Sequence, residues 1–161
     1  AIIYIRYGIH DLNESAKRIY QTALSTPEDH SVVILAHNGP TVAIIYIRYG
    51  IHDLNESAKR IYQTALSTPE DHLIVILAHN GPTGLGSNVD DICGRDWVFG
   101  GGDHGDPDLA NAISQSKETT KLSIPLVVFG HMHKLLAYGN GLRKMIVVGD
   151  NNTVYLNEAI V

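Results

Sequence analysis

The chain has 161 residues, a length that suits one domain, and a hydrophobic fraction of 44%, which is enough to build a core. Its formal net charge of -5 argues against nonspecific nucleic-acid binding, which needs a basic face. The single cysteine, Cys93, excludes an internal disulfide framework and favours a reducing compartment. No apolar run reaches the length of a membrane span and no signal peptide is recognisable, so we expect a soluble intracellular protein with no membrane partner.

The first half of the chain is a tandem duplication. Residues 1–42 recur as residues 43–84, and only three positions differ: Ser31 against Leu73, Val32 against Ile74, and Val42 against Gly84. Solenoid folds need about three or more copies and rarely keep them this similar. The duplication is therefore interpreted as recent or artificial, with an error in the sequence as the alternative, and the whole chain is treated as one domain. The missing initiator methionine suggests a processed product or a fragment.

Each copy is predicted to form a strand, a helix and a second strand. In the second copy, residues 43–47 are β-branched and aromatic and favour a strand. Asp53 is a plausible helix N-cap, with Glu56 in the capping-box position. Apolar residues then follow at helical spacing to Ala65, and an apolar strand is expected at residues 73–78. We expect the two strands of each copy to be parallel, because a helix joins them.

Histidines follow two of the predicted strands. His79 comes directly after residues 73–78, and the first copy has His37 at the equivalent position. Of these two, His79 is the predicted site residue, because its copy has the more apolar strand and continues into a glycine-containing loop. A second buried strand is predicted at residues 124–129, and Gly130 then precedes His131 and His133.

The histidines that follow these strands predict a metal site. Residues two apart in an extended backbone point the same way, so His131 and His133 could aim at one point. If the strands preceding His79 and His131 are parallel neighbours, all three imidazoles meet at the carboxyl edge of the sheet. Three converging histidines are typical of metal binding. The alternative is a surface loop that carries histidines by chance.

A long loop is predicted between residues 87 and 108. It contains the cluster Asp103, His104 and Asp106, which could ligate a metal, support a ligand histidine or hold substrate. Asn80, next to His79, is a candidate for the same supporting roles. The alternative is that the two aspartates form turns and that Asp106 caps a following helix with Pro107 in its first position. Near the C-terminus, residues 144–148 and 153–156 predict strands joined in a hairpin.

Four segments together resemble the calcineurin-like metallophosphoesterases. They are LAHNGPTG at residues 77–84, DICGRDW at 91–97, GDHGDPD at 102–108 and GHMH at 130–133. The segments at 91–97 and 102–108 look like those of a subfamily found in cyanobacteria and plants, and the resemblance covers residues 43–161. The resemblance implies an α/β fold of βαβ units with a mixed sheet and a C-terminal hairpin, as part of a two-sheet sandwich. It also implies a cytoplasmic or plastid location and a small phosphoester substrate.

The same resemblance implies a divalent metal centre. His79 and His131 would ligate one ion and His133 another, with manganese, iron or zinc as the metals. The family's remaining ligands come from an N-terminal half with Asp-x-His and Gly-Asn-His motifs, and neither motif occurs in this chain. Two adjacent dications need bridging carboxylates, so we expect one ion rather than two. The chain resembles the C-terminal half of the family's domain.

Two functions therefore remain open. The first is a metal-dependent phosphoester hydrolase that is incomplete and weakly active or inactive alone. The second is a non-catalytic metal-binding fragment, which could form homo-oligomers because a missing half leaves apolar sheet surface uncovered. A nucleotide-binding βαβ domain is disfavoured, because no Gly-x-Gly-x-x-Gly or P-loop sequence stands at a strand-to-helix turn.

Overall fold

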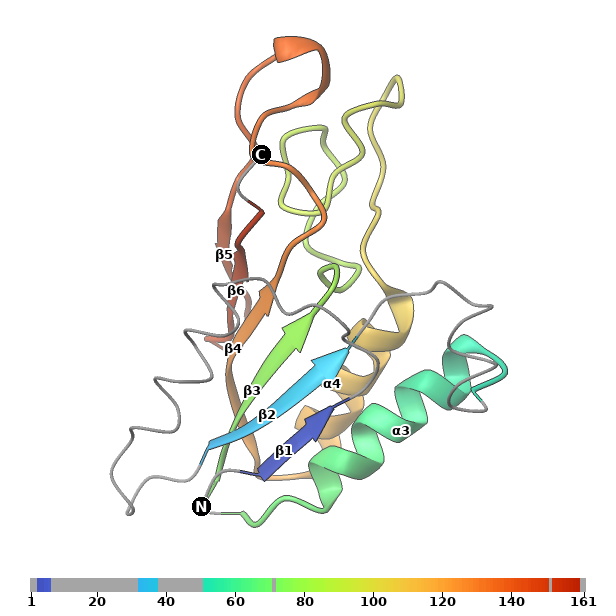
Figure 1. Ribbon diagram of the computed structural model, residues 1–161, viewed down its shortest axis with the longest axis vertical. Helices are drawn as coiled ribbons and strands as arrows, with labels where there is room; N and C mark the ends of the chain where they lie inside the picture. The colour runs from blue at the N-terminus through green and yellow to red at the C-terminus, as the bar shows by residue number, and fades with distance from the viewer. Residues whose placement is uncertain (1–2, 7–31, 38–50, 71, 151, 160–161) are drawn as a thin grey trace.

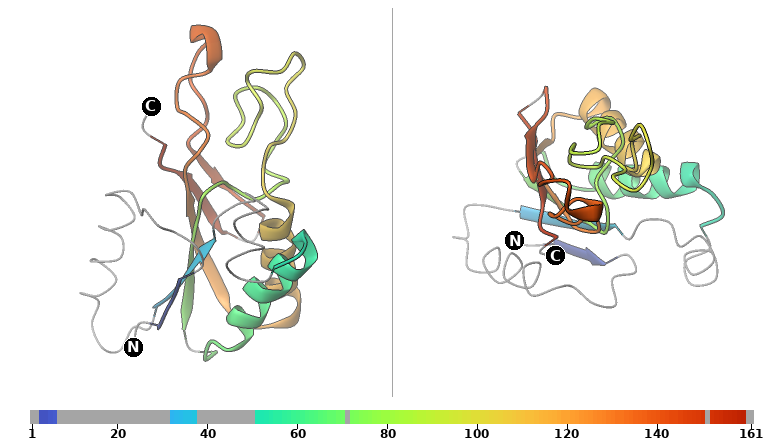
Figure 2. Two further views of the ribbon diagram at one scale, coloured as in Figure 1. Left: turned by 45° about the vertical axis from the view of Figure 1, so that its right-hand side comes forward. Right: turned by 90° about the horizontal axis from the view of Figure 1, so that it is seen from above.

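The computed structural model describes residues 3–6, 32–37, 51–70, 72–150 and 152–159, and all structural statements below refer to them. They form a mixed α/β fold in which two α-helices cover one face of a six-stranded sheet (Figure 1 and Figure 2). The elements are β1 (Ile3–Arg6), β2 (Val32–His37), α3 (Leu54–Leu66), β3 (Leu73–Ala78), α4 (Pro107–Thr119), β4 (Ser123–Phe129), the short 3-10 helix η1 (Ala137–Gly139), β5 (Ile146–Val148) and β6 (Val154–Asn157).

The sheet is mixed, as the sequence predicts. Its strand order is β1-β2-β3-β4-β6-β5, and every neighbouring pair is parallel except the antiparallel β5–β6 hairpin. The predicted hairpin is confirmed, and its turn closes through a hydrogen bond that the Gly149 N–H donates to the Thr153 carbonyl. All the described strands belong to one sheet, so the two-sheet sandwich stays a prediction.

The duplicated segments contribute neighbouring strands. β2 from the first copy lies beside β3 from the second, in parallel, with His37 opposite Ala78. The predicted helix of the first copy and the predicted strand at residues 43–47 lie outside the described residues, as does the side chain of His37. Within the described residues, no helix is long and apolar enough to span a membrane.

Helix α3 begins where its capping signal is predicted. Asp53 is the N-cap, and its side chain accepts a hydrogen bond of 2.8 Å from the Glu56 N–H. Glu56 in turn accepts from the His52 N–H at 2.6 Å, so both carboxylates satisfy N–H groups at the start of the helix. The buried face comprises Ser57, Ala58, Ile61 and Ala65. Leu54, the first of the apolar residues at helical spacing, is instead exposed.

Helix α4 packs against α3 and ends the long loop. Asp106 occupies its N-cap position and Pro107 follows at the start of the helix, as predicted. The Ser57 hydroxyl donates a buried 2.5 Å hydrogen bond to the Asp108 carboxylate, which ties the two helices together. The core then fills the space between helices and sheet with buried apolar side chains, which include Ile74, Ile76, Leu109, Ala112, Ile113, Val127 and Phe129. Burial of such side chains stabilises the fold by about 1.5–3 kcal/mol each.

Candidate metal centre at the carboxyl end of the sheet

The predicted adjacency of the two histidine-bearing strands is confirmed. β3 and β4 are parallel neighbours, with Leu77 opposite Val128 near their carboxyl ends. Beyond the strands, the Gly130 N–H donates a 3.1 Å hydrogen bond to the His79 carbonyl, so the two loops leave the sheet side by side. This end of a parallel sheet is where open α/β folds bind ligands. The loops extend well beyond the strands, as Figure 1 shows.

His79 and His131 come together at this edge. Their ring centres are 4.7 Å apart and their planes are tilted by 50°. The backbone of His131 has a φ of 68°, in the left-handed region that non-glycine residues rarely adopt. The residues from His131 to His133 are therefore not extended, and the expectation that both side chains point the same way for that reason is wrong. The bend follows directly after the end of β4 and Gly130.

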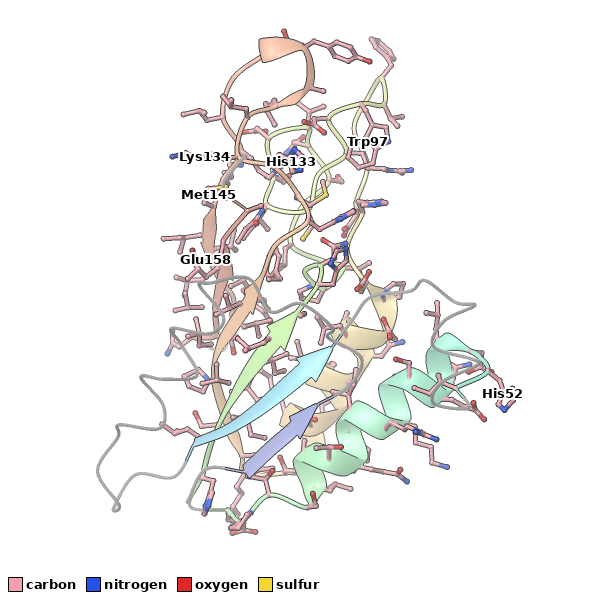
Figure 3. All side chains as sticks on the ribbon, viewed as in Figure 1. His52, Trp97, His133, Lys134, Met145 and Glu158 are labelled. Atoms are coloured by element: carbon pink, nitrogen blue, oxygen red, sulfur yellow. The ribbon has the colours of Figure 1, made fainter. Side chains whose placement is uncertain are left out.

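The second ring against His131 is that of His104. The two rings are stacked, with centres 5.7 Å apart and planes 23° apart, and Trp97 packs edge-on against His104 with centres 5.0 Å apart. The long loop thus brings a third imidazole to the site, that of His104, for which the sequence leaves open metal ligation, support of a ligand histidine and substrate contact. His133 is exposed and points from its own loop towards the long loop, while Lys134 points outward (Figure 3).

The environment of His131 favours its neutral form. Burial lowers its pKa from the ordinary value of 6.5, and the positive charges of His79, His104 and His133 lower it further. His133 is therefore close enough for its charge to act on His131. A neutral imidazole keeps a nitrogen lone pair available, which is the form that binds metal ions.

Asn80 and Asp103 hold the backbone around the imidazoles. Asn80 is buried, its amide nitrogen donates a 2.6 Å hydrogen bond to the His104 carbonyl, and its oxygen accepts from the Gly81 N–H. Asp103 accepts from the N–H groups of Gly84 and Gly105, at 2.7 and 2.8 Å, so its carboxylate shapes the loop. Gly81 is needed beside Asn80, because a side chain there would meet Phe129 and Cys93 at about 2.5 Å.

Asp106 is also buried, at the junction of the long loop and α4. Its N–H donates to the Gly81 carbonyl at 2.7 Å, and its carbonyl accepts from the Thr83 N–H. Its side chain makes no capping hydrogen bond to α4, although it occupies the N-cap position. Asp106 therefore joins the loop after β3 to the first turn of the helix.

Arg143 joins the two histidine-bearing loops, a role that no sequence pattern indicates. It is 4% exposed, and its guanidinium donates hydrogen bonds to carbonyl oxygens from both loops and forms an ion pair of 3.2 Å with Asp96. The carbonyl acceptors belong to Val89, Asp91, Gly94 and His133. Asp96 also accepts a 2.6 Å hydrogen bond from the Ala137 N–H. One arginine thus fixes the backbone of His133 relative to the loop that carries His104.

The geometry can be tested against metal binding. Two imidazoles that bind one ion in adjacent positions, through nitrogens about 2.0–2.1 Å from it, have ring centres about 4.5–5.2 Å apart. The separation of His79 and His131 falls in this range. His104 is less suited to share the same ion, because its ring lies nearly parallel to that of His131 and lone pairs point along the ring planes. Among the described residues, no group of three or more His, Cys, Asp or Glu side chains is placed to hold a metal ion.

Comparison with known proteins adds no family assignment. No protein-family model, curated protein or solved structure matches this chain. The function therefore has to be argued from the site alone.

Proposed function

We propose that this chain binds one divalent transition-metal ion at the carboxyl edge of its sheet and derives from a phosphoester hydrolase of the calcineurin-like metallophosphoesterase type. The observation that carries the proposal is the pair of imidazoles at the ends of adjacent parallel strands, His79 and His131, with ring centres 4.7 Å apart. The lowered pKa of His131 supports it, because the ring stays neutral where an ordinary imidazole begins to protonate.

In this proposal each residue of the site has a distinct task. His79 and His131 hold the ion, and His133 is the candidate third ligand. His104 stacks on His131 and restricts the rotation of its ring, while Trp97 supports His104 from its edge. Asn80 fixes the His104 backbone through its amide. When bound, a divalent ion would supply a Lewis acid for a phosphoryl oxygen and lower the pKa of a coordinated water.

The donor set favours one ion over two. Two adjacent dications need carboxylates between them, and imidazoles carry no negative charge to neutralise the pair. The nearby carboxylates have other tasks, since Asp103 accepts backbone N–H groups and Asp96 pairs with Arg143. We therefore propose weak or absent hydrolysis by the chain alone. The alternative is a purely metal-binding role, which the same shortage of carboxylates favours.

Metal titration tests the binding proposal directly. We expect about one equivalent of zinc, manganese or iron(II) to bind in calorimetry, and His79→Ala or His131→Ala to weaken the affinity about tenfold or more, since each removes a ligand. His52→Ala is the matched control, because Figure 3 places His52 near the start of α3, away from the loops. Equal affinities for the control and the site variants would contradict the proposal, as would the absence of any bound ion.

Hydrolysis separates the enzyme from the metal-binding alternative. An aryl phosphate monoester and a diester are incubated with the protein and manganese, and the rates of wild type and His131→Ala are compared. A rate that depends on both manganese and His131 supports the hydrolase. Equal inertness of the two proteins, combined with metal binding by the wild type, leaves the non-catalytic role.

A further inference from the structure

The tips of the two long loops carry an unusual set of exposed apolar side chains. Phe99 is fully exposed and Tyr138 is 87% exposed, although large aromatic side chains are usually at least half buried. We name the set the apolar crown, and its members are Trp97, Val98, Phe99, Leu135, Tyr138 and Leu142. Figure 1 shows the two loops projecting together at one end of the molecule, beyond the sheet. Exposed apolar groups gathered in this way mark interaction sites.

The two parts of the crown are held together by polar contacts at their bases. Asp96, which precedes Trp97, accepts a hydrogen bond from the Ala137 N–H, which precedes Tyr138. The buried Arg143 pairs with the same carboxylate, and Leu135 forms a β-bridge with Leu142 across the second loop. The crown is therefore one braced surface, although its members come from segments about forty residues apart in the chain.

Tyr138 is exposed at the loop tip and has a strained backbone conformation. Its φ is 61°, inside the left-handed region, where a bulky side chain is an outlier and the strain amounts to about 1–3 kcal/mol. The glycines that follow, Gly139 and Gly141, also have positive φ angles and form the turn that keeps the tyrosine at the tip. A strained residue whose side chain packs against little of its own protein gains nothing for the fold, which points to a role in contact with another surface.

We propose that the apolar crown is a docking surface for a phospholipid membrane, into whose headgroup region these side chains insert. Tryptophan, tyrosine and phenylalanine beside leucine are the side chains that favour the boundary between headgroups and acyl chains. The charges at the tips suit a lipid surface: residues 97–102 and 134–142 contain no acidic residue, and their one charged side chain, Lys134, is an exposed cation. Anionic or zwitterionic headgroups would therefore meet no exposed carboxylate at either tip.

A lipid surface fits the crown better than a protein partner does. A stable protein interface needs about 800 Å² from each partner in a complementary, well-packed patch. The crown instead consists of two protruding loop tips that are braced only at their bases, and a fluid lipid layer can accept these without matching their shape. Contact of this kind requires no spanning helix, so the absence of an apolar span from the sequence does not bear on it. The inference does not require a bound metal ion, although Trp97 belongs to the crown and also packs against His104 of the candidate metal site.

The fluorescence of Trp97, the single tryptophan of the chain, can report contact with lipid. Trp97 lies within the crown and is half exposed, so insertion moves its ring from water into an apolar layer. The protein is mixed with vesicles of phosphatidylcholine, alone or with anionic phosphatidylglycerol, without added metal. We expect co-sedimentation with the vesicles, a shift of the Trp97 emission to shorter wavelength, and quenching by brominated lipid.

A double variant tests whether the crown is responsible. Phe99→Ser with Tyr138→Ser leaves the probe in place and alters only exposed side chains, so folding, checked by circular dichroism, should persist. We expect this variant to lose about tenfold or more in vesicle affinity, since each side chain removes one apolar anchor. Leu54→Ser with Leu66→Ser is the matched control on α3, because both leucines are also exposed, and its affinity should equal that of wild type.

Three outcomes would overturn the inference. Wild-type protein that neither sediments with either vesicle nor changes its emission does not dock on lipid. Equal affinities for the two double variants would show that binding does not involve the crown. Self-association without lipid, measured by light scattering and abolished only by the crown variant, would identify the surface as a contact between copies of this chain instead.

Discussion

The two ends of this molecule are held together by different forces. Between helices and sheet, apolar side chains such as Ile74 and Val127 are fully buried, and the few polar groups there pair locally, as Ser57 does with Asp108. At the carboxyl end, the loops that carry the histidines also bury apolar side chains such as Ile92 and Met132, but buried polar contacts link the loops to one another. Arg143, with four carbonyl acceptors and one carboxylate, is the centre of that network.

This difference predicts how each end responds to mutation. An apolar core loses stability in proportion to the groups removed and to the cavity left behind. A buried polar network fails more abruptly, because removal of one member leaves its partners desolvated and unsatisfied. The candidate metal site lies at the second kind of end, so its geometry depends on residues that never touch the ion.

The largest expected effect is that of Arg143→Ala. This change leaves the Asp96 carboxylate and several carbonyl groups without their partner in a buried site, and loss of one member of a buried ion pair typically costs about 3–5 kcal/mol. Urea denaturation followed by circular dichroism measures the change in the free energy of unfolding. Because the loops separate, NMR signals of the His104 and His133 rings should also shift.

Two reference variants sharpen this comparison. Ile76→Val removes one methylene from the fully buried core and should cost about 0.5–1.5 kcal/mol without moving the histidine signals. Lys144→Gln changes the neighbouring but exposed cation and should cost much less than Arg143→Ala. If Ile76→Val proved as costly as Arg143→Ala, the two ends would not differ as described.

A smaller effect is expected from Asn80→Ala. The variant removes a buried amide that bonds the His104 carbonyl and the Gly81 N–H, and loss of such a buried hydrogen-bonding partner costs about 1–3 kcal/mol. Metal affinity should fall along with stability, because His104 no longer restricts the His131 ring. Asn111→Ala on the exposed side of α4 is the matched control. An unchanged metal affinity in a destabilised Asn80→Ala protein would show that Asn80 serves the fold alone.

The sequence predicts the helix-covered end well and the loop end only in part. Apolar periodicity, the Asp53 cap and the Asp106-Pro107 pair locate both helices, and the apolar runs locate β3 and β4. These signals are local, so they can be recognised in the sequence without knowledge of the fold. The stacking of His104 on His131 and the role of Arg143 depend on the path of two loops through space. Local sequence patterns do not determine the path of the two loops.

The positions of His79 and His131, soon after two apolar runs, likewise indicate the pair but not the packing of the His104 ring against it. The left-handed turn at His131 decides which neighbours its ring meets. The side chains at the loop tips have no periodicity at all. Only their exposure in the folded chain distinguishes Phe99 and Tyr138 from ordinary core aromatics.

The smallest expected effect concerns pH and the contact between Lys144 and Asp91 at the base of the loops. The Lys144 ammonium, which donates a 2.7 Å hydrogen bond, and the Asn88 N–H lower the pKa of Asp91 below its ordinary value of 3.8. As the pH falls, Asp91 is therefore protonated in the unfolded chain before it is protonated in the folded chain. The stabilisation that the Asp91 carboxylate contributes is complete above pH 3.8 and is lost as the pH falls through the lowered pKa.

Lys144→Gln should be less stable than wild type at neutral pH, by less than either Arg143→Ala or Asn80→Ala. The difference, measured by urea denaturation, should close well below pH 3.8. A difference that persisted unchanged in acid would show that Lys144 stabilises the loops through its aliphatic stem and not through its charge. The loop end would then depend less on electrostatics than its network of polar contacts indicates.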